Sequence, residues 1–173
     1  PRRDTGGSDL VERREGLIAE IPLADRMRPR TPEEFAGQRH LLGPGAPLRT
    51  LLEGNRAPSC ILYGPPGVGK TTLVRMMASM TDRSLLEINA VTAKVAELRD
   101  LVEEAKRLKT MAAGLTAIAF VDELYHFNRS QQNVLLPSVE RGDIILVGTT
   151  TENPWIEINK TLLSRMVTLE LHP

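Results

Sequence analysis

The sequence has little cysteine, few aromatic residues and no excess of either charge. Only one of its 173 residues is a cysteine, so no disulfide can form within the chain. Its 22 basic and 22 acidic side chains balance, and the overall charge therefore does not point to nucleic acid or to an acidic membrane surface as a partner. No apolar run is long enough to span a membrane and no signal sequence opens the chain, which favours a cytoplasmic protein.

Two further shortages narrow the function. Aromatic residues make up 3% of the chain, so no platform for stacking bases stands out, and any DNA contact is expected to be to phosphates. His40, His126 and His172 lack metal-ligand spacing, and one cysteine cannot complete a zinc site. Cys60, in an apolar stretch, is expected to be a small buried hydrophobe.

The length indicates one domain with a hydrophobic core. We expect residues 1–20 to form a polar tail with at most a few helical turns, and residues 21–173 to form the core domain. The chain opens at Pro1 without a methionine and stops soon after an apolar run, so we expect a fragment of a longer protein.

One stretch, residues 60–72, organises the rest of the chain. Gly64, Gly69, Lys70 and Thr71 match the phosphate-loop pattern G-x-x-x-x-G-K-[ST], which a chain of this length matches by chance roughly once in a hundred. Glycines let successive backbone N–H groups point at phosphate oxygens, and the following helix adds its positive end. Lys70 is expected to reach the outer phosphates of ATP, and Thr71 to give its hydroxyl to Mg²⁺. The predicted nucleotide-binding set is Gly64, Pro65, Pro66, Gly67, Val68, Gly69, Lys70, Thr71 and Thr72.

Strands and helices are expected to alternate along the chain. Apolar runs predict strands at 60–63, 85–88, 115–121, 143–147 and 167–171. Helical spacing predicts helices at 47–53, 70–80, 94–109, 130–136 and 159–166, and Thr31-Pro32 with the acids that follow is typical of a helix start. The predicted fold is α/β, a P-loop NTPase with a five-stranded parallel sheet flanked by helices.

Polar residues follow three of these strands, whose carboxyl ends share one edge of the sheet. Asp122 ends an apolar strand, as a magnesium-binding aspartate does, and Glu123 beside it can orient or deprotonate the water that attacks the γ-phosphate. Thr151 and Asn153 either touch the γ-phosphate or serve only as turn residues. Arg165 either lies at a helix end as a surface residue or acts as an arginine finger on a neighbouring subunit's nucleotide.

These residues together carry a family resemblance. The motifs at 22–29, 35–38, 64–72, 127–128 with 131–132, 150–154 and 163–165 resemble the RarA family of AAA+ ATPases, also called MgsA, which act in replication-fork maintenance. The sequence departs from the family pattern at Tyr125, at His126, which stands where the family has an arginine, and at Met166.

The resemblance implies an AAA+ core whose helical lid would lie beyond Pro173. It implies that Arg28, Pro29 and Gln38 border the adenine. It also implies that Thr151 with Asn153 forms sensor 1 and that Arg165 is a finger acting in trans.

The resemblance further implies an ATP- and Mg²⁺-dependent ATPase of replication, repair and recombination, stimulated by DNA and nucleoid-associated. The expected partners are a second copy of the chain in a homo-oligomer (a tetramer), DNA ends, gaps or forks, and single-strand-binding protein. Two alternatives stay open: a clamp-loader-type ATPase subunit, and a nucleotide-sensing scaffold with little turnover.

Overall fold

The structure is a computed structural model that describes residues 27–173. The predicted tail at 1–20 and the first part of the 22–29 motif lie outside these residues. Among the helices of residues 27–173, none combines the length and the apolar character needed to cross a membrane.

Five parallel strands form a single sheet in the order β2-β3-β4-β1-β5. They are β1 (Cys60–Tyr63), β2 (Leu85–Asn89), β3 (Ile118–Asp122), β4 (Ile145–Thr150) and β5 (Val167–Glu170). The central strands are nearly continuous apolar runs because helices cover both of their faces. The predicted five-stranded parallel sheet is therefore confirmed.

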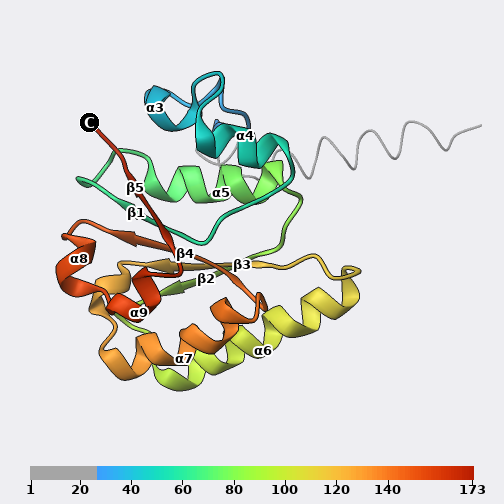
Figure 1. Ribbon diagram of the computed structural model, residues 1–173, viewed down its shortest axis with the longest axis vertical. Coiled ribbons are helices and arrows are strands. Elements are labelled where there is room, and N and C mark those ends of the chain that lie inside the picture. The colour runs from blue at the N-terminus through green and yellow to red at the C-terminus, as the bar shows by residue number, and fades with distance from the viewer. Residues whose placement is uncertain (1–26) are drawn as a thin grey trace, which may run out of the picture.

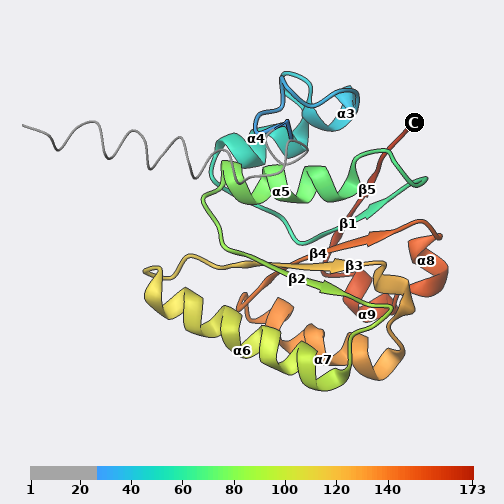
Figure 2. The ribbon, with the colours of Figure 1, turned by 180° about the vertical axis from the view of Figure 1, so that it is seen from behind.

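Helices cover the sheet on both sides, as Figures 1 and 2 show. One side carries α3 (Arg39–Leu42), α4 (Pro47–Glu53) and α5 (Lys70–Met80), and the other carries α6 (Val95–Met111), α7 (Arg129–Glu140) and α9 (Lys160–Leu163). A short 3₁₀ turn, η1 (Leu124–His126), follows β3, and the short helix α8 (Pro154–Glu157) follows β4. The chain thus folds as three layers with the strands in the middle.

Each face of the sheet has its own apolar cluster. On the α5 side, Leu73, Met76 and Met77 pack against the sheet and are fully or almost fully buried, which confirms that these methionines fill the core. Cys60 is also fully buried, as predicted, and burial raises the pKa of its thiol to about 12. On the α6 side, Leu98 and Ala105 belong to the second cluster.

The start of α7 explains one of the sequence motifs. The side chain of Asn128 accepts a hydrogen bond from the Gln131 N–H at 2.9 Å, and the Gln131 side chain accepts one from the Asn128 N–H at 3.0 Å. This reciprocal pair is a capping box, which satisfies two otherwise free donors of the helix end. Buried Gln132 then accepts from the Asn159 N–H at 2.7 Å, which ties α7 to the segment before α9.

One predicted helix is wrong, and the last one is shorter than predicted. Residues 31–35 form a single turn, in which the Glu34 N–H donates to the Thr31 carbonyl at 3.1 Å, because Gly37 and Gln38 take positive φ angles of 82° and 53° that a helix cannot contain. The last helix covers Lys160–Leu163 rather than 159–166, so Arg165 lies in the turn after it.

The short helices α3 and α8 and the turn η1 were not predicted. Elements of three or four residues are too short to show a helical repeat of apolar positions.

Candidate nucleotide-binding and hydrolysis site

A hollow of about 370 Å³ lies at the carboxyl ends of the central strands. Its lining comes from the phosphate loop, the end of β3 and the residue after β4: Pro66, Gly67, Gly69, Lys70, Thr71, Thr72, Asp122, Glu123 and Thr151. All nine belong to the predicted site. The parallel register brings them to one edge of the sheet, as ligand sites in such folds require.

Two glycines of the phosphate loop are required by their surroundings. Gly64 has φ 152°, and a Cβ there would lie 2.3 Å from the carbonyl oxygen of Leu171, which directly follows β5. Gly69 has φ 96°, and a Cβ there would lie 2.9 Å from Cζ of Phe35. The loop is therefore held between the end of β5 and a buried phenylalanine, and it leads directly into the first turn of α5.

The side chain of Lys70 is folded back onto the loop. Its Nζ donates to the carbonyl oxygens of Gly64 at 2.7 Å and Pro65 at 2.9 Å, and the residue is 9% exposed. Burial lowers the pKa of Lys70, and the negative charges of Glu123 and Asp122 partly oppose that shift. Its ammonium group is thus held at the hollow between loop carbonyls and the carboxylates of β3.

The two carboxylates at the end of β3 differ in their contacts. Asp122 Oδ1 accepts a hydrogen bond from the Thr149 hydroxyl at 2.6 Å. Glu123 has a left-handed backbone with φ 54°, and its Oε2 is buried without a hydrogen-bond partner. A buried carboxylate oxygen without a partner is costly unless a ligand or water engages it, so its presence at the hollow indicates a site that a bound molecule completes.

The residues fit a magnesium ion held together with a nucleotide. The Thr71 hydroxyl and the Asp122 carboxylate are hard oxygen donors of the kind Mg²⁺ takes. Within residues 27–173, no three His, Cys, Asp or Glu side chains come together to hold a metal ion by themselves. An ion here would therefore draw its remaining ligands from phosphate oxygens and water.

The two residues predicted after β4 have different surroundings. Thr151 is exposed and lines the hollow. Asn153 does not line it, and its Oδ1 accepts from the Trp155 N–H at 3.0 Å as the N-cap of α8. The structure thus brings Thr151 to the hollow, while a contact between Asn153 and nucleotide stays a prediction.

Arg165 does not line the hollow of its own chain. Its guanidinium lies 3.2 Å from Glu140 at the end of α7, with about half of its side chain exposed. A role toward its own nucleotide has no support in this placement, and a role in trans stays a prediction.

The predicted adenine border is only partly placed. Gln38 is buried, but its side chain is used elsewhere: Nε2 donates to the His172 carbonyl at 2.6 Å and Oε1 accepts from the His172 N–H at 3.0 Å. Arg28 and Pro29 are half-buried and line no part of the hollow at the phosphate loop. Their contact with adenine stays a prediction.

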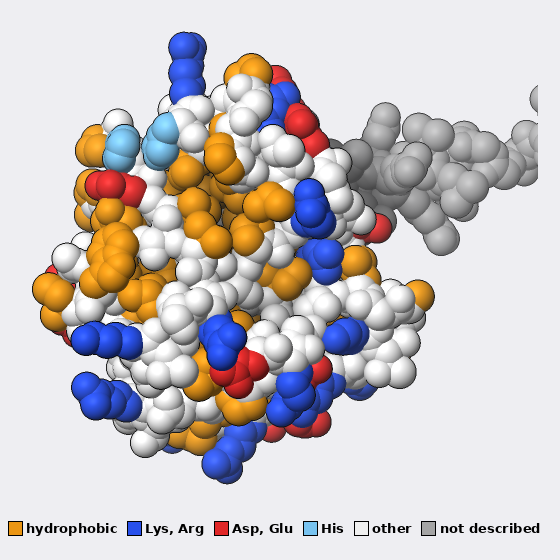
Figure 3. Space-filling view, viewed as in Figure 1, with side chains coloured by type: hydrophobic (Ala, Val, Ile, Leu, Met, Phe, Trp, Pro, Cys, Tyr) orange, Lys and Arg blue, Asp and Glu red, His pale blue; other side chains and the backbone are white. Residues whose placement is uncertain are grey.

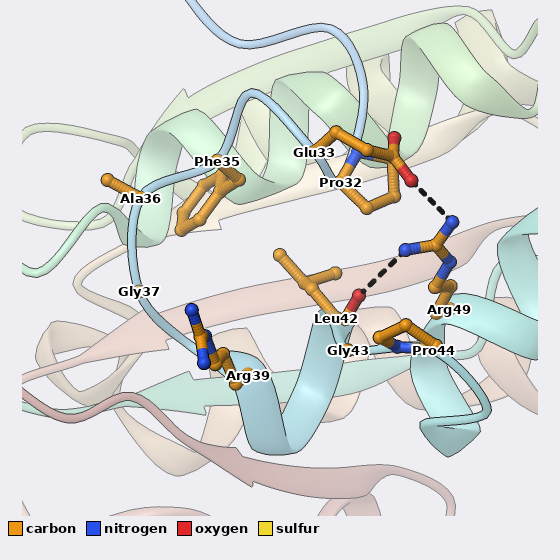
Figure 4. A pocket seen from close by; sticks show the side chains of 10 residues that line it. All are labelled: Pro32, Glu33, Phe35, Ala36, Gly37, Arg39, Leu42, Gly43, Pro44 and Arg49. Atoms are coloured by element: carbon orange, nitrogen blue, oxygen red, sulfur yellow. Dashed lines mark hydrogen bonds and ion pairs between the residues drawn. The ribbon is translucent and has the colours of Figure 1, made fainter.

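A second and larger hollow, of about 780 Å³, lies among residues 32–49 (Figure 4). Phe35 is one of its lining residues, and Arg49 donates to the Glu33 carboxylate and to the Leu42 carbonyl. The Arg49 charge is already met by Glu33 and Glu53. Size alone therefore does not identify the reactive site, since the smaller hollow holds the lysine and both strand-end carboxylates.

Sequence reasoning missed Thr149. It is fully buried on β4 and contacts both residues at the end of β3, since its hydroxyl also accepts from the Glu123 N–H at 3.1 Å. No local pattern could show this contact, because it depends on the register in which Val121 of β3 pairs with Gly148 of β4.

This arrangement defines the class of P-loop nucleotide-binding domains. It consists of strand β1, the glycine loop and helix α5, with strand β3 of the same parallel sheet leading into two carboxylates. Within this class the chain belongs to the AAA family: the family described as "ATPase family associated with various cellular activities (AAA)" matches residues 60–171.

The chain is similar to bacterial recombination proteins. Replication-associated recombination protein A of Coxiella burnetii is 51% identical over 145 residues, which are 84% of this chain and 32% of that protein. The Escherichia coli K12 protein of the same name is 46% identical over 144 residues, 83% of this chain and 32% of that protein. The resemblance to the RarA family is confirmed, and the chain spans about a third of the length of these relatives.

A solved structure supports the same fold. The Thermotoga maritima RuvB Holliday junction branch migration motor aligns with a TM-score of 0.67 and 27% identity, over 84% of this chain and 48% of that chain. The α/β AAA fold predicted from the sequence is therefore confirmed.

Proposed function

We propose that this domain binds ATP with Mg²⁺ and hydrolyses it to ADP and phosphate. The observation that carries the proposal is the hollow in which the phosphate loop, Lys70, Asp122 and Glu123 meet, with one Glu123 oxygen buried and without a partner. Kinases transfer the phosphoryl group to a substrate and must keep water away, so a second carboxylate at this position favours hydrolysis.

Each residue has a task that follows from its chemistry. Backbone N–H groups of the loop and the first turn of α5 bind phosphate oxygens, and Lys70 exchanges its two loop carbonyls for them. Thr71 and Asp122 would hold the ion, which neutralises charge on the phosphates when bound. Glu123 Oε2 accepts a hydrogen bond from water and orients it as general base.

The test compares wild-type protein with Glu123→Gln, which keeps the shape of the side chain but cannot take a proton. We expect ATP binding to remain within a few-fold of wild type and turnover to fall by about 10²-fold or more. Unchanged turnover in Glu123→Gln would reject Glu123 as the base. Intact binding without turnover in the wild type would favour the nucleotide-sensing scaffold.

We further propose that the longer protein containing this domain is a homo-oligomer, a tetramer, that acts on DNA ends, gaps or forks with single-strand-binding protein. The support is the similarity to proteins named for replication-associated recombination. Turnover of the full-length protein should then rise on addition of gapped or single-stranded DNA. Turnover that never responds to DNA would favour a different output, such as the clamp-loader type.

In this proposal, the positive charge of Arg165 stabilises the negative charge that develops on the γ-phosphate in the neighbouring subunit's site. Arg165 must leave Glu140 to do so. A mixing experiment tests this. Arg165→Ala and Glu123→Gln are each expected to be inactive alone in the full-length oligomer. Mixed oligomers regain part of the turnover, because a Glu123→Gln subunit lends its finger to an intact site next to it. No recovery on mixing, with mixed assembly verified by differential tags, would refute action in trans.

A further inference from the structure

The hydroxyl of Thr149 joins the two residues that the proposed site depends on most. It donates to Asp122 Oδ1 at 2.6 Å and accepts from the Glu123 N–H at 3.1 Å. A hydroxyl has one proton to donate, and here that proton goes to the carboxylate. The 2.6 Å distance is in the range of a charge-assisted hydrogen bond.

The surroundings of Thr149 leave it no freedom to turn away. The residue is fully buried, on a strand paired on both sides, with Leu62 of β1 as its partner in register. The preceding residue, Gly148, is so close to η1 that a Cβ there would lie 2.7 Å from Cδ2 of Leu124 and 3.0 Å from Cδ1 of Ile61. Strand β4 and the turn after β3 are therefore packed in direct contact. A shift of β4 would displace residues 122–124.

The bond to the Glu123 N–H has a particular consequence. Glu123 has a left-handed backbone, φ 54°, which residues with a side chain adopt only when their surroundings hold them there. The Thr149 oxygen accepts the N–H of this residue, and the Glu123 carboxylate then lies at the hollow with Oε2 buried. One hydroxyl thus orients the carboxylate of Asp122 and the backbone that directs Glu123.

We propose that Thr149 is a positioning residue of the ATPase site: its hydroxyl holds Asp122 in the orientation that binds the magnesium–nucleotide complex and holds Glu123 in the orientation that activates water. The inference rests on the proposed function, because it assigns a partner to the two carboxylates of that site. Thr149 itself does not line the hollow and touches no reacting atom.

The experiment uses three variants of the full-length protein. Thr149→Val keeps the branched shape and removes the hydroxyl, and Thr149→Ser keeps the hydroxyl. Thr150→Val is a matched control, since Thr150 is equally buried on the same strand but its hydroxyl bonds to the backbone of Glu152 at 2.9 and 3.2 Å rather than to Asp122.

The main readout is the affinity for a fluorescent ATP analogue with excess Mg²⁺ and with EDTA. In Thr149→Val, we expect the affinity gain that Mg²⁺ provides to shrink about tenfold or more, with the affinity in EDTA unchanged. Thr149→Ser and Thr150→Val are expected to keep the wild-type gain. The magnesium concentration that gives half-maximal turnover should rise in Thr149→Val alone, and kcat should fall more than KM rises.

Several outcomes would overturn the inference. A folded Thr149→Val variant with the wild-type magnesium gain would do so, and so would an equal loss of that gain in Thr150→Val, since both point to packing alone. If the wild type binds magnesium–nucleotide but never hydrolyses it, the proposed hydrolysis fails while the magnesium gain still decides the role of Thr149. If the wild type shows no magnesium gain, the inference is rejected directly.

Discussion

Gln38 connects the segment before α3 to the end of the chain, and removing its side chain should loosen that connection. Its amide makes two hydrogen bonds with the backbone of His172, at 2.6 and 3.0 Å. Net contributions of about 1 kcal/mol per hydrogen bond give about 2 kcal/mol for Gln38→Ala. For a chain of this length, that corresponds to a fall in Tm of about 4–8 °C.

A second contact to His172, made by His40, means that the stability losses of the two variants should not be additive. His40 stacks on His172 with 4.5 Å between ring centroids, and its Nε2 lies 2.8 Å from the Glu170 carbonyl oxygen. Figure 3 shows pale blue histidine side chains at the upper left of this face of the molecule. If Gln38→Ala already releases residues 170–173, the contacts of His40 with His172 and Glu170 are partly lost, and His40→Ala then removes less stabilisation. The double variant should therefore be less destabilised than the sum of the single variants.

Urea unfolding of the 173-residue chain, with equal slopes m for all variants, measures these effects. Gln38→Glu is the matched control, because its carboxylate still accepts from the His172 N–H but cannot donate to the carbonyl. It should destabilise nearly as much as Ala, because its second carboxylate oxygen would face the His172 carbonyl oxygen and the two acceptors repel each other. A loss below about 0.5 kcal/mol in both variants, together with a tenfold loss of ATP affinity, would refute this assignment and support the adenine contact predicted from the sequence.

Three further predictions concern the phosphate loop and the strand before it. Gly69→Ala should destabilise the folded domain by about 1–3 kcal/mol and abolish ATP binding, because the new Cβ would meet Phe35. Gly67→Ala is the milder comparison, since Gly67 also has a positive φ but open space around it. Urea unfolding and nucleotide titration measure the two effects. Cys60 should resist thiol reagents at neutral pH in the native state and react at once in urea, since burial raises its pKa to about 12; fast native labelling would contradict this. Burial lowers the pKa of Lys70 below the ordinary lysine value of 10.5, so ATP affinity should already fall as the pH approaches 10.5 from below. In the same pH range the free protein should gain stability, since the unfolded chain then binds more protons than the folded one. An ATP affinity that stays unchanged up to pH 10.5 would contradict the lowered pKa.

Local patterns were enough to predict the central part of the site. The phosphate loop has four pattern positions, Gly64, Gly69, Lys70 and Thr71, whose types are required by backbone angles or by phosphate chemistry, so its recognition needs no tertiary information. Asp122 and Glu123 were found because an apolar strand must end where polar residues begin. The parallel sheet then brings both features to one edge.

The features that the sequence did not predict depend on contacts between distant residues. Thr31-Pro32 has the composition of a helix start, yet burial of Phe35 against Gly69 and the positive φ angles that follow make it a turn. Gln38 contacts a residue 134 positions away, which no local pattern can show. Thr149 required the register between β3 and β4, and a strand pattern predicts that a residue is buried without predicting which neighbour it meets.

The end of β4 connects the nucleotide hollow with the surface of the molecule through a few consecutive residues. The hydroxyl of Thr149 donates to Asp122 at the end of β3, and Thr151 lines the hollow. Asn153 caps α8, on which the side chain of Trp155 is 56% exposed. Thr149 and Asn153 each hold a hydrogen bond, so a displacement of this segment would strain one of the two. Arg165 is connected to this segment through α7, since Gln132 of α7 donates to the Glu157 carbonyl of α8 at 3.4 Å and Glu140 of α7 pairs with Arg165. We therefore expect a displacement of Thr151 on nucleotide binding to reach α8 first, and Arg165 only through α7.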